Sequence, residues 1–330
     1  MKKILIFLLL LVTITNKVKS TYTVYLNYSA CSLQDAYHQD YPSKKILAEA
    51  ERVVNTFTLS DYDYNTFINV KAGVYKVDCS SFLSYVLAIS VYDWYEKIYA
   101  HAVLSRFPST KNNPTLERCL AKDFYSFFKN YNIKSDKYKG WEIISGLNDL
   151  NPGDIITIKY EDGASNTGHV LILAGEPIQL EGFSNTPVGY TEFLVKIIDS
   201  SASPHGTSTT YWPRVRDTRT DNSKNVDEGG VGMGYMILGT KDTDTEQKIQ
   251  FWRRSNLSSS VIYRNDPSNL SSGSYTTRPI LFGRAVPYDN DPEKYSNYYG
   301  VNMDRILPYK TLDTTGFTGG SDESGDQTGD

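Results

Sequence analysis

The chain has 330 residues, of which 40% are hydrophobic and 22% are charged, as in an ordinary globular protein that forms one large domain or two small ones. The formal net charge is −4, and no long run of lysine and arginine occurs. Because phosphate groups are bound through clustered Lys and Arg, this pattern argues against nucleic acid as a partner.

The first twenty residues have the pattern of a secretory signal peptide. Lys2 and Lys3 form a short positive segment that precedes an apolar run at residues 4–14. This run is far shorter than the roughly 20 residues that a membrane-spanning helix needs. We therefore expect cleavage after Ser20 and a secreted, extracellular chain without membrane attachment. An uncleaved anchor is the alternative interpretation.

The mature chain shows helical patterns first and strand patterns later. A polar arm at residues 21–43 precedes a predicted helix at 44–57, and a second amphipathic helix is predicted at 114–131. Short β-rich runs follow at residues 155–158, 168–175, 193–198, 231–238 and 280–286. This order predicts an α+β fold whose helices pack on an antiparallel sheet or barrel. The expected organisation is a main domain at 44–240, a C-terminal extension packed on the core at 241–314, and a disordered acidic tail at 315–330.

A third helix is predicted to begin near Cys79. Residues 82–89 are apolar without the alternation of a half-buried strand, and Asp78 and Ser80 just before them favour helix N-termini. Unpaired N–H groups and the macrodipole at such an N-terminus favour a negative charge. A thiol at this position is therefore a candidate nucleophile, because cysteine attacks as the thiolate.

The chain has three cysteines, so in a secreted protein at most one disulfide can form within it and one thiol stays unpaired. We expect a disulfide between Cys31 and Cys119, worth roughly 3–4 kcal/mol for a long loop, and a free Cys79. Three buried free thiols are the alternative. If the source is eukaryotic, Asn-x-Ser triplets predict glycosylation at Asn27, Asn256 and Asn269.

Of the four histidines, His169 has the most suggestive position, directly after Gly168 at the head of an apolar strand. It is the candidate general base. A third group must orient the imidazole, and Asp199 at the end of the next strand is the candidate, with His205 as its competitor. Each residue taken singly also has a structural explanation, as a buried thiol, a strand histidine or a turn aspartate.

Three segments in the same order resemble motifs of the NlpC/P60 superfamily of papain-like cysteine peptidases. Residues 78–82 resemble its nucleophile segment, residues 150–156 its Leu-x-Pro-Gly-Asp segment, and residues 167–172 its Gly-His-Val strand. The resemblance covers roughly residues 44–200. It implies a papain-like fold in which Cys79 is the nucleophile and His169 the base.

The resemblance also assigns supporting roles. It implies that Asp199 is the third residue, that Asp78 caps the helix beside Ser80, and that the Cys79 backbone N–H helps to hold the oxyanion. A tyrosine that supports the oxyanion site in the family is assigned to Tyr75. The sequence departs from the family at Ser81, where the family has glycine, and at Asp199, where His, Asn or Gln is common.

The resulting prediction is a secreted cysteine peptidase or amidase that hydrolyses peptide bonds of bacterial peptidoglycan through Cys79, His169 and Asp199. We expect a monomer with no cofactor and no metal, since no His-x-x-x-His or Cys-x-x-Cys spacing occurs. The alternatives are an acyltransferase or lipid amidase on the same fold, and a non-catalytic secreted glycoprotein.

Overall fold

The computed structural model describes residues 42–108, 116, 118–131, 140–180, 186–205, 217–221, 226–254, 262–266 and 276–287. Several predictions therefore lie outside the described residues: the signal peptide, all but the end of the polar arm, Cys31, the acceptors Asn27, Asn256 and Asn269, and the acidic tail. Nothing in the structure bears on them.

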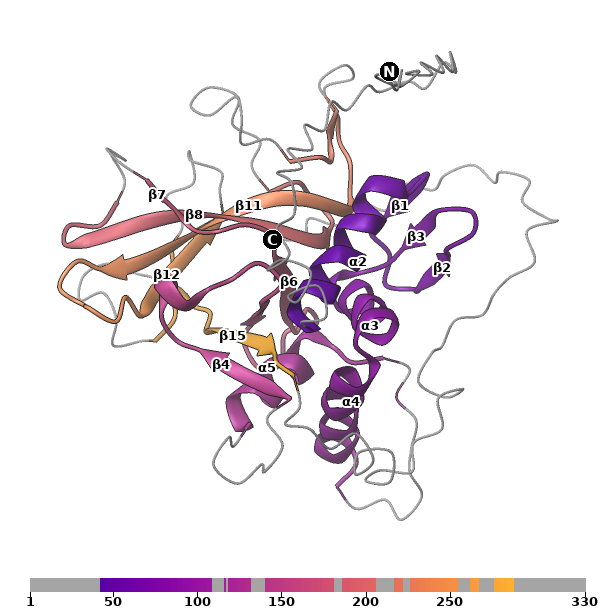
Figure 1. Cartoon of the computed structure of the whole chain (residues 1–330), viewed down its shortest axis with the longest axis horizontal. Helices are drawn as coiled ribbons and strands as arrows, with labels where there is room; N and C mark the ends of the chain where they lie inside the picture. The colour runs from indigo at the N-terminus through magenta and orange to yellow at the C-terminus, as the bar shows by residue number, and fades with distance from the viewer. Residues whose placement is uncertain are drawn as a thin grey trace, which may run out of the picture.

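The described residues form a mixed α+β fold, as the order of helical and strand patterns predicts (Figure 1). One large sheet has the strand order β14-β13-β12-β11-β8-β6-β5-β15-β4, with β7 also paired to β8. Its pairings are antiparallel except that of β13 with β14. The strands are β4 (Trp141–Ile144), β5 (Ile155–Lys159), β6 (Gly168–Leu173), β7 (Ile178–Leu180), β8 (Tyr190–Ser201), β11 (Gly230–Lys241), β12 (Ile249–Arg254), β13 (Tyr263–Arg264), β14 (Thr276–Thr277) and β15 (Ile280–Ala285).

Four α-helices lie together beside this sheet: α2 (Pro42–Thr56), α3 (Cys79–Ser90), α4 (Tyr92–Arg106) and α5 (Ala121–Asn130). A small sheet of β1 (Leu59–Asp61), β3 (Val74–Lys76) and β2 (Phe67–Asn69) adjoins them, β9 (Thr220–Asp221) pairs with β10 (Val226–Asp227), and a 3-10 turn covers Leu147–Asp149. None of the helices among the described residues combines the length and the hydropathy that crossing a bilayer requires.

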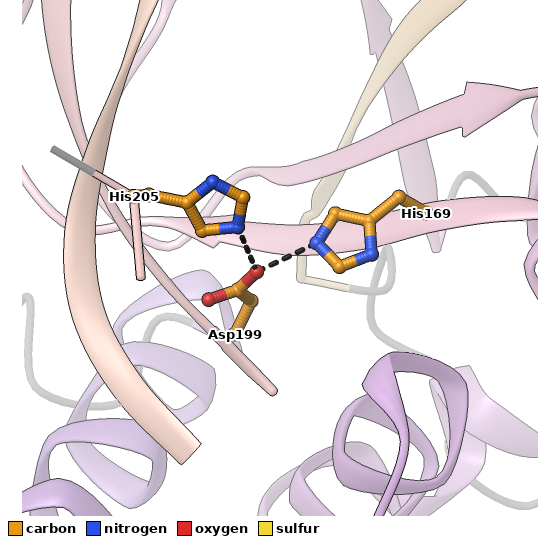
Figure 2. Close-up of side chains that lie close together, drawn as sticks. All are labelled: His169, Asp199 and His205. Carbon is orange, nitrogen blue, oxygen red and sulfur yellow. Dashed lines mark hydrogen bonds and ion pairs between the residues drawn. The ribbon is translucent and has the colours of Figure 1, made fainter. Parts of the chain in front are cut away.

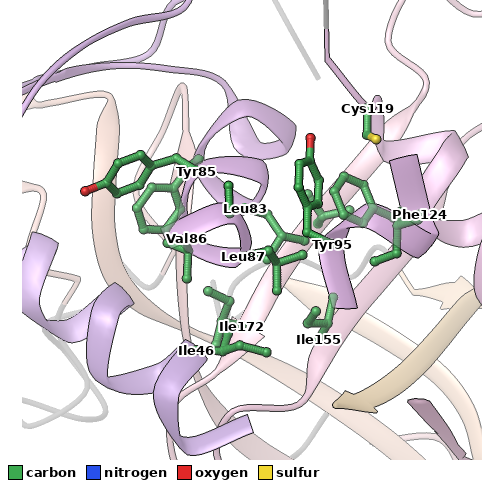
Figure 3. Packing of buried hydrophobic residues seen from close by; sticks show 14 of the residues in the cluster. Ile46, Leu83, Tyr85, Val86, Leu87, Tyr95, Cys119, Phe124, Ile155 and Ile172 are labelled. Atoms are coloured by element: carbon green, nitrogen blue, oxygen red, sulfur yellow. The ribbon is translucent and has the colours of Figure 1, made fainter. Parts of the chain in front are cut away.

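Alternate residues of the central strands contribute to two separate hydrophobic cores. Ile155 and Ile172 pack with the helices, and Figure 3 shows them below Leu83 and Leu87 of α3. Their neighbours Ile156, Leu171 and Leu173 join a second cluster with residues of β8, β11 and β15. Because α3 has neighbours on several sides, all its residues from 79 to 88 are buried. Its sequence therefore lacks the single apolar stripe by which a surface helix is predicted.

The five β-rich runs and the helices at 44–57 and near Cys79 are confirmed within a few residues. The helix predicted at 114–131 is wrong at its start, because Leu120 still has extended backbone and α5 begins only at Ala121. The fold also places β15 between β4 and β5. The part of 241–314 that the structure describes adds β12, β13, β14 and β15 to the sheet.

Candidate functional site

Cys79 is the first residue of α3, and Asp78 is the N-cap. The Asp78 carboxylate accepts hydrogen bonds from the Ser81 backbone N–H at 2.7 Å and from Ser80 Oγ at 3.0 Å. Asp78 thus caps the helix, as the sequence predicted. The backbone N–H of Cys79 lies in the first turn, where N–H groups have no intrahelical acceptor. A thiolate and an oxyanion are both favoured at such a position.

A partly buried arginine that the sequence did not reveal, Arg118, reinforces this cap. Arg118 Nη1 donates to Asp78 Oδ2, to Ser80 Oγ at 3.2 Å and to Ser81 Oγ at 2.8 Å. The side chains of Arg118 and Asp78 are 16% and 7% exposed, so their attraction is little screened by solvent. This ion pair ties the segment before α5 to the turn that carries Cys79.

Strand register explains why His169 and Asp199 meet. Antiparallel β6 and β8 pair Ile172 with Ile198 and Leu173 with Ile197. Continued towards His169, this register places residue 171 opposite Asp199, so His169 is a diagonal neighbour on the same face. His169 Nε2 lies 2.6 Å from Asp199 Oδ2. The structure therefore brings together two residues that the sequence could link only by their positions on successive predicted strands.

His205 binds the same oxygen. Its Nε2 lies 2.9 Å from Asp199 Oδ2, and Figure 2 shows the two imidazoles approaching this oxygen from opposite sides. A carboxylate can only accept, so each Nε2 carries its hydrogen. The Nδ1 atom of His169 then remains as the nitrogen that can exchange a proton with Cys79. His205 is thus a partner of Asp199 and not its replacement as the orienting group.

Cys79 lies close enough to His169 to act on the pKa of its imidazole. Burial lowers the pKa of His169, but the charge of Cys79 and the hydrogen bond with Asp199 outweigh it, so the pKa lies well above its ordinary value of 6.5. Such a histidine keeps its proton at neutral pH when it faces a thiolate. This is the electrostatic state that a thiolate–imidazolium pair requires.

Asp199 is held as a carboxylate although it is buried. Burial raises its pKa, but the charges of Arg219 and His205 and the hydrogen bonds from both histidines outweigh this, so the pKa lies well below its ordinary value of 3.8. Arg219 Nη2 lies 3.0 Å from Asp199 Oδ1 and 2.7 Å from Asp217 Oδ2. Neither Arg219 nor Asp217 belongs to a recognisable motif, so sequence inspection did not identify them.

The tyrosine near the thiol is Tyr62. Burial raises the pKa of Tyr62, as do the charges of Cys79, Tyr64 and Asp78 and a hydrogen bond with Tyr64. Tyr75 had been expected in this role, but its hydroxyl lies 3.2 Å from Arg52 Nη2, and its ring packs edge-on against Tyr85. The family spacing of about a dozen residues falls on Phe67, between Tyr64 and Tyr75, and does not point to Tyr62, which directly follows β1 of the small sheet. The role assigned to Tyr75 stays a prediction.

The histidine–aspartate cluster also contains donor types that bind metal ions. One ligand atom from each of His169, Asp199 and His205 lies within 4.8 Å of the others. The prediction of no metal rested on the absence of short ligand spacings, whereas these donors converge from separate strands and loops. However, Arg219 already supplies a positive partner for Asp199. The expectation of a metal-free site therefore stays a prediction.

Cys119 lies away from this chemistry. Its thiol is free and fully buried, and burial and the charge of Asp123 raise its pKa to about 12. The described residues therefore lend no support to a bridge with Cys31, which lies outside them.

Comparisons with protein-family models, with curated proteins and with solved structures find no significant match for this chain.

Proposed function

We propose that this protein is a secreted cysteine hydrolase with a papain-like core of NlpC/P60 type, in which Cys79, His169 and Asp199 form the catalytic triad. One observation carries the proposal: His169 donates from Nε2 to a buried Asp199 while also interacting with a thiol at the first residue of a helix. A nucleophile, a base and a group that orients the base are what thiol-dependent acyl transfer requires.

The reaction has two steps. The Cys79 thiolate attacks the carbonyl carbon of an amide, and the protonated His169 gives its proton to the departing amine, which leaves a thioester on Cys79. Water then attacks the thioester carbonyl while His169 accepts a proton, releasing the carboxylic acid and the free thiolate. Asp199 orients the imidazole and stabilises its charged form without itself taking up a proton.

Two groups near Cys79 suit the negative oxygen that forms in each step. The backbone N–H of Cys79 is an unpaired donor of the first helical turn, and the hydroxyl of Tyr62 is the second candidate. Removing one such donor costs about a hundredfold to a thousandfold in kcat in a related kind of site. Tyr62→Phe therefore separates an oxyanion role from a packing role.

The substrate class follows from the resemblance of the three motifs and not from the site geometry. We propose peptide amide bonds of bacterial peptidoglycan, which the mature protein would meet outside the cell that makes it. The test is turbidity loss of purified peptidoglycan together with mass spectrometry of the released fragments. The wild-type protein should release peptides with new carboxyl and amino ends.

The matched variants are Cys79→Ala and Cys119→Ala, which remove a triad thiol and a buried thiol outside the triad. Product release should stop with the first and persist with the second. Equal release by wild type and Cys79→Ala would contradict the mechanism. No release by wild type would reject peptidoglycan as substrate.

A chelator should leave product release unchanged, whereas a loss of release that added zinc reverses would indicate a metal at His169, Asp199 and His205.

Acyl transfer on the same fold is the second candidate, because a thioester on Cys79 can also be resolved by an amine or alcohol. Adding such acceptors to the same assay distinguishes the two reactions. Free acid as the product supports hydrolysis, and a transferred acyl group supports a transferase. A protein that gives neither product and whose Cys79 reacts like an ordinary buried thiol is the non-catalytic glycoprotein.

A further inference from the structure

We propose that Arg219 is a positioning residue for the candidate base His169, acting through the Asp199 carboxylate. The proposal rests on the proposed function and identifies a residue that sets the geometry of its triad. Arg219 Nη2 forms an ion pair with Asp199 Oδ1 at 3.0 Å without hydrogen-bond geometry, while both histidines share Oδ2. One carboxylate oxygen therefore faces the arginine charge, and the other accepts from the two histidines.

Glycines on β11 provide the space for Arg219. Gly232 lies directly opposite Asp199 in the β8–β11 register, and Gly230 and Gly234 lie on the same face of the strand. A Cβ atom at Gly232 would come within 2.6 Å of Arg219 Nε. Gly232 thus leaves the space that the Arg219 side chain fills beside Asp199, whereas a Cβ atom at Gly234 would meet Asp217 and His205.

The guanidinium is fixed at all three nitrogens. Nε and Nη2 of Arg219 donate to the two oxygens of Asp217 at 2.9 and 2.7 Å, and Nη1 donates to the Gly230 carbonyl at 3.1 Å. Such a bidentate pair fixes the plane of the arginine as well as its charge. Asp217 Oδ2 also accepts the His205 backbone N–H at 2.6 Å. One network therefore contacts both the Asp199 carboxylate and the backbone of His205, whose imidazole is the second one on Asp199.

This arrangement has a consequence for the thiol. With Oδ1 held by Arg219, Asp199 cannot rotate away from His169 without breaking an ion pair that is 3% exposed on the arginine side and 0% on the aspartate side. The pKa of Asp199 is low because of that charge, and the pKa of His169 is raised by Asp199 and Cys79. Removing Arg219 should therefore reduce the population of the reactive thiolate–imidazolium pair.

The test uses a readout that needs no substrate: the rate of Cys79 alkylation by iodoacetamide at pH 5 to 10, followed by peptide mass spectrometry. In the wild type, Cys79 should be alkylated already at pH 5 to 7, whereas a His169→Gln variant should not be. The charged and titratable groups that face this cluster are Cys79, His169, His205, Asp199, Arg219, Asp217 and Tyr62.

Arg219→Gln should lower the rate below pH 7 by roughly tenfold to a hundredfold, the size of loss known for the outer hydrogen-bonding partners of metal-binding histidines and carboxylates. Arg219→Lys should fall between this variant and wild type, because it keeps the charge but not the bidentate geometry. If Arg219→Gln fails to fold, Arg219→Gln with Asp217→Asn removes one charge of each sign and serves the same purpose.

The matched control is Arg253→Gln, which breaks a buried ion pair with Glu192 on the same sheet. Residues 192 and 199 are seven positions apart on β8, about 23 Å at the rise of a strand. This variant should be less stable but keep the wild-type profile. A folded Arg219 variant with the wild-type profile overturns the proposal. A wild type without low-pH reactivity instead overturns the proposed function itself, and this inference with it.

Discussion

Gly232 on β11 lies directly opposite Asp199 on β8, and the space above it is filled by the Arg219 side chain. We predict that Gly232→Ala costs about 1–3 kcal/mol of unfolding free energy, as overpacking usually does, and slows Cys79 alkylation by displacing Arg219. Urea unfolding and alkylation rates measure the two effects. Gly239→Ala, on the same strand and against the Phe251 ring, should destabilise the fold and leave the alkylation rate unchanged.

The two histidines that share Asp199 Oδ2 should not be equivalent. His169 contacts Cys79 as well as Asp199, whereas the contacts of the His205 ring are to Asp199 and the His169 ring. His169→Gln should therefore remove both the low-pH alkylation of Cys79 and the catalytic turnover. His205→Gln should keep measurable turnover with an altered pH profile. If His205→Gln is as inactive as His169→Gln, the assignment of the base must be revised.

Asp199 should make the unfolding free energy of the protein depend on pH in the acidic range. Because its pKa is lowered in the folded state, its contribution is complete above its ordinary value of 3.8 and is lost as the pH falls through the lower folded value. The difference in unfolding free energy between wild type and Asp199→Asn should therefore shrink from pH 5 to pH 2. His169 adds no pH dependence to the stability in this window. Its raised pKa leaves it protonated in both the folded and the unfolded chain, so its contribution is constant.

Urea titrations at four pH values in that range provide the measurement. Asp162→Asn is the control, because Asp162 is an exposed carboxylate paired with Lys159 at the surface. Its difference from wild type should stay near zero throughout. A constant difference for Asp199→Asn would mean that the carboxylate is not ionised in the native protein at pH 5.

Cys119 should behave as an inert thiol in the native protein. Its raised pKa and complete burial predict no alkylation at pH 8 until the chain is unfolded by urea. Peptide mapping without reduction provides the measurement and also tests the expected bridge. A cross-linked peptide containing residues 31 and 119 would show that the bridge forms, whereas a free residue 119 modified only in urea would exclude it.

Sequence patterns were sufficient for the parts of the site that depend on local structure. Asp78 and the apolar run after it predicted the start of α3, and the runs at 168–175 and 193–198 predicted the strands that carry His169 and Asp199. The positions of the two residues on successive predicted strands then made them candidates for one site. Local signals of this kind depend on neighbours a few residues away, which a single sequence displays directly.

The rest of the site depends on long-range packing that leaves no local signal. Arg118 reaches Asp78 across 40 residues, and Arg219 reaches Asp199 from a turn that precedes β11. The one available hint was the alternation of glycines at 230, 232 and 234, because glycine in a strand often marks the close approach of another group. Tyr62 was missed for the same reason, since its distance along the chain from Cys79 differs from the family spacing.

The position of β15 between β4 and β5 has a consequence for how the protein acquires its structure. Residues 155–159 pair with residues 280–285, so the β4 end of the sheet is completed only after most of the chain has emerged. Contacts at such separation slow folding and leave strand edges unpaired in the meantime. A chain cut short before residue 280 would keep Cys79, His169 and Asp199 yet lack the strand that joins β4 to β5. Removal of this late strand would therefore free β4 from the sheet and expose the edge of β5 without touching any residue of the proposed triad.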